Sequence, residues 1–245
     1  MSLSMSCDGK AVGGHIVPSP TPPQRGAVWG FWSTVGWIAL ATGAGNAAAA
    51  ACRGLHGAGL PVGELAAILA PFTAIAVLAF AAHRAHWPIG EYLGLFRPRL
   101  ADLAIGIAAL YALALAVEIA ARLSGLNFPP SGAPQLVPIM PALYTVMFAP
   151  VLEEVLFRGF LYRGWEQTRL GSVGTIVLSS MLFSAVHLRY GHWLIFASIF
   201  CVGLLFGWLR RRTGSIVVPI LLHVMTNGKN VLQLRWFDWL DHFMR

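Results

Sequence analysis

The stretch FAPVLEEVLFRGFLYRGW, residues 148–165, combines the apolar character of a membrane-spanning helix with three charged residues near its middle. Those residues are Glu153, Glu154 and Arg158. A spanning helix needs about 20 mostly apolar residues, and ionisable side chains inside one are costly, so they mark a functional site or a structural ion pair. The stretch therefore predicts a membrane protein with a polar site inside its membrane part.

The composition of the whole chain agrees with a membrane location. Of its 245 residues, 57% are hydrophobic and only 11% are charged, whereas soluble domains carry about 25% charged residues. Arginine-rich loops that face anionic lipid explain the net charge of +7. The sequence has no run of basic residues interleaved with aromatic ones, so nucleic-acid binding is not indicated. The cysteines Cys7, Cys52 and Cys201 show no metal-binding or redox spacing.

Apolar segments predict an all-α polytopic transmembrane bundle of about seven to eight spans, with a catalytic cluster buried between helices. The expected spans are residues 27–52, 61–82, 101–122, 140–165, 172–188, 193–209 and 215–231.

The predicted membrane domain, residues 27–232, is flanked by two segments of different composition. Residues 1–26 are polar and rich in Pro, Ser and Gly, so we expect a disordered tail without the apolar core of a signal peptide. Residues 233–245 alternate aromatic and charged side chains, which favours an interfacial segment. Between the second and third spans, residues 86–100 suit a short segment on the membrane surface, and residues 127–138 suit an exposed connector.

Loop charges predict the orientation of the chain in the membrane. With a cytoplasmic N-terminus, ten Lys and Arg residues fall on the cytoplasmic side and six on the other. The cluster Arg210–Arg212 contributes most to this bias. We therefore expect an integral protein of the plasma membrane, with its N-terminus inside and, for seven spans, its C-terminus outside.

Polar residues occur at matching depth in three of the predicted spans. The residues are Glu153, Glu154 and Arg158 in the fourth span, His187 in the fifth, and His223 and Asn227 in the seventh. At 1.5 Å per residue, they lie about 12–22 Å from the cytoplasmic ends of their helices. They can therefore meet in one layer within the membrane.

Helical spacing separates the two adjacent glutamates. Glu154 and Arg158 are four residues apart and share one face of the helix. Arg cannot lose its proton, so it requires an anion inside the membrane, and Glu154 is the nearest candidate. Glu153 is rotated by about 100° from Glu154 and should face a group on another helix. We expect one structural carboxylate and one working carboxylate.

These side chains suit the hydrolysis of an amide. A carboxylate and a histidine can hold and deprotonate a water, and a second histidine with an amide can donate hydrogen bonds to an oxyanion. The sequence lacks the GxSxG, GxGD and HExxH patterns of other protease classes. Three alternatives stay open: a purely structural ion pair with interfacial histidines, a transporter with an ion or proton relay, and a non-catalytic immunity protein.

Three motifs, in this order, resemble the CAAX-protease and bacteriocin-processing (CPBP, or Abi) family, which includes the Ras-converting CAAX prenyl protease. EEVLFR at 153–158 resembles EExxxR, FSAVH at 183–187 resembles FxxxH, and HVMTN at 223–227 resembles HxxxN. The resemblance covers about residues 140–230, and GEYLGLFRP upstream resembles a surface segment of the family. It implies an intramembrane endopeptidase that acts on prenylated C-termini or peptide precursors.

The resemblance also implies a role for each matched residue. These roles are water activation by Glu153 with His187 beside it, oxyanion stabilisation by His223 and Asn227, and support of the helix arrangement by Glu154 with Arg158.

No cofactor is favoured by these residues, which fit a metal-free glutamate mechanism. Glu153, His187 and His223 could also supply three zinc ligands with an open fourth position, so a zinc-dependent protease is the alternative. The expected partners are the lipid bilayer and a membrane-associated protein or peptide substrate.

Overall fold

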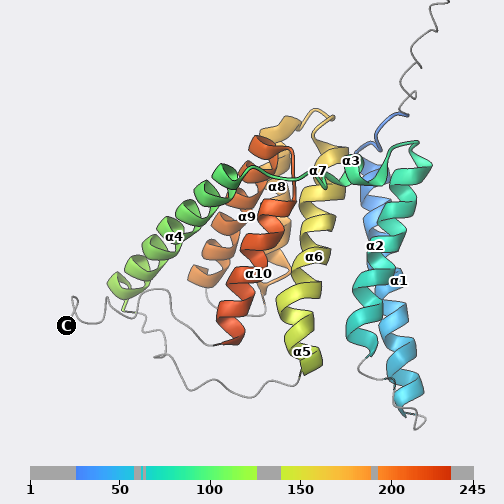
Figure 1. The fold of residues 1–245 in the computed structure, drawn as a ribbon, viewed down its shortest axis with the longest axis horizontal. Coiled ribbons are helices and arrows are strands. Elements are labelled where there is room, and N and C mark those ends of the chain that lie inside the picture. The colour runs from blue at the N-terminus through green and yellow to red at the C-terminus, as the bar shows by residue number, and fades with distance from the viewer. Residues whose placement is uncertain (1–25, 58–61, 63–64, 126–138, 189–192, 233–245) are drawn as a thin grey trace, which may run out of the picture.

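The computed structural model describes residues 26–57, 62, 65–125, 139–188 and 193–232, and every regular element within these ranges is a helix (Figure 1). Five of the helices are long and apolar enough to cross a membrane. They are α1 (Phe31–Gly57), α2 (Ala66–Arg84), α4 (Leu100–Leu123), the composite helix Ile139–Trp165 and α9 (Trp193–Thr213). The prediction of an all-α polytopic membrane protein is confirmed. The predicted tails and the connector at 127–138 lie outside the described residues.

Two of the predicted spans form helices that are shorter than expected. α8 (Gly171–Ala185) and α10 (Val217–Val231) have 15 residues each, below the about 20 that a full span requires. α8 ends before the turn at Val186 and His187, and α10 begins after the turn at Gly214 and Ser215. Each helix is two residues shorter than the predicted segment, which was 172–188 for α8 and 215–231 for α10.

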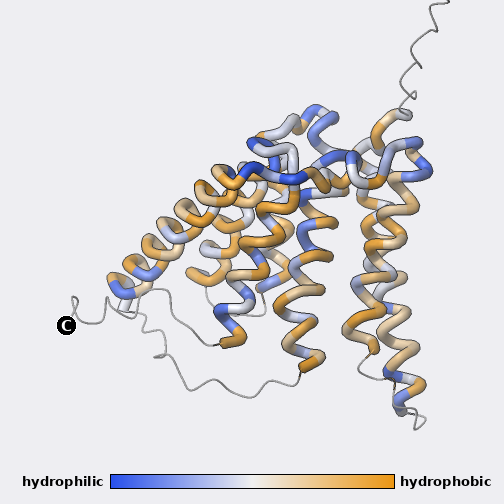
Figure 2. The backbone as a smooth tube through the Cα atoms, viewed as in Figure 1, coloured by the Kyte–Doolittle hydropathy of each residue, from blue (hydrophilic) through white to orange (hydrophobic). Residues whose placement is uncertain are grey.

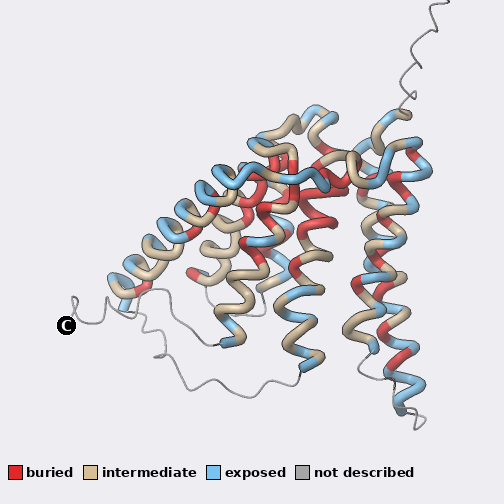
Figure 3. Tube along the Cα trace, viewed as in Figure 1, coloured by how far each residue is buried: buried red, intermediate tan, exposed pale blue. Residues whose placement is uncertain are grey.

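The helices form two groups, which contact each other along residues 144–161 of the composite helix (Figure 1). α1 and α2 pack against each other as an antiparallel pair, and the composite helix packs beside α8, α9 and α10. α4 leans away from α9 and α10 along much of its length. Buried residues concentrate in the part of the composite helix near α3 (Ile89–Leu93) and in the helices around it (Figure 3).

Most hydrophilic residues lie at the helix ends, but some interrupt the apolar surfaces of the composite helix and of α10 (Figure 2). The described basic residues are unevenly divided between the two ends of the bundle. We call the end that carries α3 and the turn between α9 and α10 the arginine-rich end; its residues are Arg84, Arg97, Arg99, Arg163, Arg169, Arg210, Arg211 and Arg212. The opposite end carries Arg53, Arg122 and Lys229.

Glycines bring α9 into close contact with α8. A Cβ atom at Gly203 would lie 2.9 Å from the Cβ of Ser180, and one at Gly207 would lie 2.8 Å from Cγ2 of Ile176. The hydroxyl of Ser180 donates to the Ile176 carbonyl of its own helix at 2.6 Å, so it adds no unsatisfied polar group to this contact. Small residues that allow such close approach are a common basis of helix association in membranes.

We expect Gly203→Ala to lower the free energy of unfolding by about 1–3 kcal/mol, because the added methyl group overpacks the contact with α8. Unfolding of the full chain in mixed micelles with increasing SDS measures this change. Gly36→Ala on α1 is the matched control, since nothing lies within 4 Å of the added Cβ. Equal stability of the two variants would contradict the close contact between α8 and α9.

Candidate active site

The composite helix that carries the predicted carboxylates is not a regular α-helix. It consists of α5 (Ile139–Leu143), the π-helical stretch η2 (Tyr144–Phe148), α6 (Ala149–Glu154), the π-helical stretch η3 (Val155–Leu161) and α7 (Tyr162–Trp165). In a π-helix each N–H bonds to the carbonyl five residues back, which widens the turn, and such stretches are frequent at functional sites. Pro150, which has no N–H to donate, lies in the first turn of α6, two residues after the end of η2.

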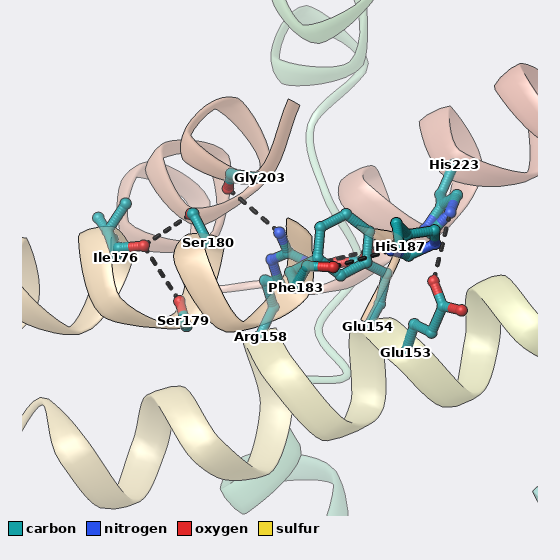
Figure 4. A network of polar contacts seen from close by, with 10 residues as sticks. All are labelled: Glu153, Glu154, Arg158, Ile176, Ser179, Ser180, Phe183, His187, Gly203 and His223. Atoms are coloured by element: carbon teal, nitrogen blue, oxygen red, sulfur yellow. Dashed lines mark hydrogen bonds and ion pairs between the residues drawn. The ribbon is translucent and has the colours of Figure 1, made fainter. Parts of the chain in front are cut away.

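Glu154 and Arg158 form a buried ion pair at the junction of α6 and η3. The Nη1 of Arg158 lies 3.1 Å from Oε1 of Glu154, and the side chains are 1% and 0% exposed. The guanidinium also donates from Nη2 to the Gly203 carbonyl on α9 at 3.2 Å and lies 4.5 Å above the ring of Phe183. A charge this deeply buried requires such partners, and the pair therefore ties the composite helix to α8 and α9 (Figure 4).

His223 lies between the two adjacent carboxylates. Its Nδ1 is 2.9 Å from Oε1 of Glu154, and its Nε2 is 3.6 Å from Oε2 of Glu153. Glu153 thus faces another helix, α10, as the helical spacing predicts. The contact with Glu154 was not predicted, because the spacing argument assigned that carboxylate to Arg158 alone. Glu154 Oε1 serves both the guanidinium and the imidazole.

The partners of the two histidines indicate the same tautomer for both rings. His223 faces through Nδ1 a carboxylate that is also paired with Arg158, so Nδ1 carries the proton and donates it. His187, in the turn that follows α8, has Nδ1 2.8 Å from the Phe183 carbonyl, which can only accept. In the neutral form, each ring therefore keeps its lone pair on Nε2.

Two phenylalanines hold the imidazoles in place. The ring centroid of Phe183 is 5.1 Å from that of His187 and 5.9 Å from that of His223. Phe206 on α9, which is fully buried, lies 5.7 Å from His223. The FxxxH pattern includes Phe183, whereas sequence reasoning missed Phe206, since nothing distinguishes it from the other apolar residues of α9.

Asn227 connects α10 back to the composite helix. Its Nδ2 donates to the carbonyl of Thr145, within η2, at 2.8 Å. An amide nitrogen carries two N–H groups, so one remains for another acceptor. Asn227 lies one helical turn beyond His223, as the HxxxN spacing requires.

A cavity of about 610 Å³ brings the predicted residues together. Glu153, His187, His223 and Asn227 line it, and Ile195, Ile199 and Val202 of α9 add an apolar wall. Glu154 and Arg158 are not among the lining residues and are fully buried. The arrangement thus offers a carboxylate, two imidazole nitrogens and an amide donor to one cavity.

The donor atoms in this cavity are not gathered for a metal ion. In the described ranges of the chain, no three His, Cys, Asp or Glu side chains converge closely enough to hold one. Glu153, His187 and His223 share a cavity wall but do not fit a three-ligand zinc site in this arrangement.

Part of the chain matches a known family. Residues 135–228 match the family described as type II CAAX prenyl endopeptidase Rce1-like. This segment is Rce1-like. It begins just before the composite helix and ends just after Asn227, so every residue predicted for the site lies within the Rce1-like segment.

Two curated proteins are similar to part of this chain. An Escherichia coli protein named "Uncharacterized 24.3 kDa protein" is 33% identical over 87 residues, which are 35% of this chain and 40% of that protein. A Bacillus subtilis protein named "Putative membrane peptidase YdiL" is 35% identical over 94 residues, 38% of this chain and 36% of its own length. The chain thus spans well under two thirds of these curated relatives. No solved structure matches.

Proposed function

We propose that this integral membrane protein is an endopeptidase that hydrolyses a peptide bond within the bilayer, with a water activated by Glu153 and histidine. The observation that carries the proposal is the position of His223, bonded to Glu154 on one side and 3.6 Å from Glu153 on the other. That distance is too long for a direct hydrogen bond, and a water in the cavity can contact both atoms together. The Rce1-like segment supports the same reaction class.

In the proposed reaction, the carboxylate of Glu153 takes a proton from a water that also donates to Nε2 of His187. The resulting hydroxide attacks the peptide carbonyl, and the oxyanion accepts a hydrogen bond from the free N–H of Asn227. His223 can donate to the same oxyanion from Nε2 only when the ring is protonated, since Nδ1 is engaged with Glu154. Glu153 then passes its proton to the leaving amine.

The remaining residues of the site support this geometry without contacting the substrate. Glu154 orients the imidazole of His223, and Arg158 holds Glu154 in place through their ion pair. Because Glu154 and Arg158 lie outside the cavity lining, we assign them a positioning role.

The substrate we propose is a membrane-associated protein or peptide that reaches the cavity from the bilayer. The lining contains one carboxylate and several apolar residues of α9, which suits an uncharged segment. We place the N-terminus in the cytoplasm and the protein in the plasma membrane, because the arginine-rich end carries most of the described basic residues.

Cleavage of a prenylated CAAX peptide tests the proposal. The purified full chain in liposomes should release the residues that follow the prenylated cysteine, detected by mass spectrometry. Peptides that co-purify with an inactive Glu153→Gln variant would identify other substrates. Failure to cleave the prenylated peptide, together with no peptide bound to the variant, would contradict the proposed function.

We expect a strong chelator to leave peptide cleavage unchanged, because the cavity residues do not fit a three-ligand metal site. The measurement compares the cleavage rate before and after dialysis of the purified chain against the chelator. Loss of activity that returns with added zinc would overturn the metal-free mechanism and favour the zinc alternative.

The contacts from Glu154 through His223 to Glu153 also suit a proton path. A transporter of this kind would carry protons across liposomes without cleaving any peptide. This second function would be favoured by two results together. The wild-type chain would carry protons but cleave neither the prenylated peptide nor the peptides that co-purify with the variant, and Glu153→Gln would abolish the proton flux.

A further inference from the structure

A second cavity lies at the arginine-rich end, separate from the active-site cavity. It has a volume of about 430 Å³ and is lined by Glu91, Phe96, Arg163, Arg210 and Gly214. None of these residues lines the active-site cavity. Arg163 lies near the end of the composite helix, and Arg210 lies in the last turn of α9. The cavity therefore lies where spanning helices end, at the level of the membrane surface.

Arg210 brings a buried positive charge to this cavity. The residue is 5% exposed, and its guanidinium donates from Nε to the Arg158 carbonyl at 2.9 Å and from Nη1 to the Gly214 carbonyl. It also lies 5.3 Å from the ring of Tyr162. No carboxylate in the described part of the chain lies within ion-pair distance of it. Two carbonyl groups accept hydrogen bonds from its guanidinium, and Glu166 is the carboxylate that interacts with it most strongly.

Arg163 adds a second guanidinium to the same cavity. It is held 4.6 Å above the ring of Trp87 and pairs with Glu166 from Nη1 at 3.3 Å. Its Nε is buried and has no hydrogen-bond partner. The two arginines thus line one cavity with donor capacity left over, and Arg is the side chain best suited to bidentate binding of phosphate oxygens.

The charges of the cavity lining select the kind of anion. Two arginines and one glutamate, Glu91, line the cavity, and Glu166 outside the lining pairs with Arg163, so the arginine charges are largely balanced and a highly charged anion is not favoured. A phosphodiester carries one negative charge, whereas inorganic phosphate and phosphomonoesters carry about 1.5 to 2 at neutral pH. Phe96 adds an apolar contact, and the cytoplasmic leaflet is rich in phospholipid. We propose that this cavity binds the phosphodiester of a phospholipid headgroup between Arg163 and Arg210.

Binding of a soluble short-chain lipid tests the proposal. The full chain in a non-ionic detergent is titrated with dihexanoylphosphatidylglycerol, and the heat of binding gives the dissociation constant. Arg163→Gln should weaken binding by about tenfold or more, as expected for loss of a charged hydrogen bond. Arg163 is the better position to change, because Arg210 also donates a hydrogen bond to the backbone of the composite helix and its loss would disturb that helix. Arg211→Gln, an exposed position beside the cavity but outside its lining, should bind like the wild type.

A second variant distinguishes loss of the site from loss of the fold. Glu91→Gln removes the negative charge of the lining and should tighten binding several-fold, a gain that misfolding cannot produce. Equal weakening by Arg163→Gln and Arg211→Gln would show diffuse attraction to the arginine-rich end and would overturn the proposal. Displacement of the lipid by inorganic phosphate at comparable concentration would overturn the assignment to a phospholipid. Neither result bears on peptide cleavage, so this test is independent of the proposed function.

Discussion

Glu153→Gln is expected to lower the rate of peptide cleavage by about 100- to 10,000-fold, the usual contribution of a general base. Gln has nearly the same shape as Glu but cannot take a proton from water. The side chain of Glu153 is 26% exposed and stands outside the pair of Glu154 with Arg158, so the folded protein should tolerate the change.

The measurement is the cleavage rate of the purified variant in liposomes, together with its amount in the membrane fraction. Glu118→Gln is the matched control, because Glu118 is also a glutamate of a spanning helix and pairs with Arg122 at 2.7 Å, away from the cavity. The control should cleave at the wild-type rate. Full activity of Glu153→Gln would contradict the proposed base.

Arg158→Met is expected to lower the free energy of unfolding by about 3–5 kcal/mol, because it leaves a buried carboxylate without its cation. Glu154 is fully buried, and its remaining partner, His223, would have to compensate alone. Unfolding in mixed micelles with increasing SDS measures the loss. Arg122→Met is the control for removing an arginine from a spanning helix. It should lower the free energy of unfolding much less, because the side chains of Arg122 and its partner Glu118 are 18% and 14% exposed.

A double variant shows how much of the destabilisation by Arg158→Met comes from the unpaired charge of Glu154 and how much from the lost packing of the arginine side chain. Arg158→Met combined with Glu154→Gln leaves no uncompensated charge, and Gln can still accept the hydrogen bond of His223. We expect the double variant to be more stable than Arg158→Met alone. If Arg158→Met and Arg122→Met cost the same, the pair of Glu154 with Arg158 would not be the structural support of the site.

Most of the fold follows from local properties of the sequence. Long uncharged segments predict spanning helices because a bilayer core has a fixed thickness and no water to bond to the backbone. α1, α2, α4 and α9 follow their predicted limits within a few residues. α8 and α10 are each two residues shorter than the predicted segments, because the chain turns at Val186 and at Gly214.

The site was predictable where it depends on helical spacing and less so where it depends on contacts between helices. Four-residue spacing predicted the pair of Glu154 with Arg158, and depth brought the histidines to the same layer. The bond between His223 and Glu154 depends on the rotation of α10 against a helix with two π-helical stretches, which sequence spacing does not encode. Phe206 and Arg210 act through tertiary contacts alone.

The lengths of α8 and α10 bear on how water reaches the buried carboxylates. At 1.5 Å per residue, each 15-residue helix extends about 22 Å, against a hydrocarbon layer of about 30 Å. Such hydrophobic mismatch is accommodated when the surrounding bilayer becomes thinner, or when the helix ends lie deeper in the membrane than the lipid headgroups. Either response brings water closer to His187 and Asn227. Water can then reach the active-site cavity without a dedicated channel.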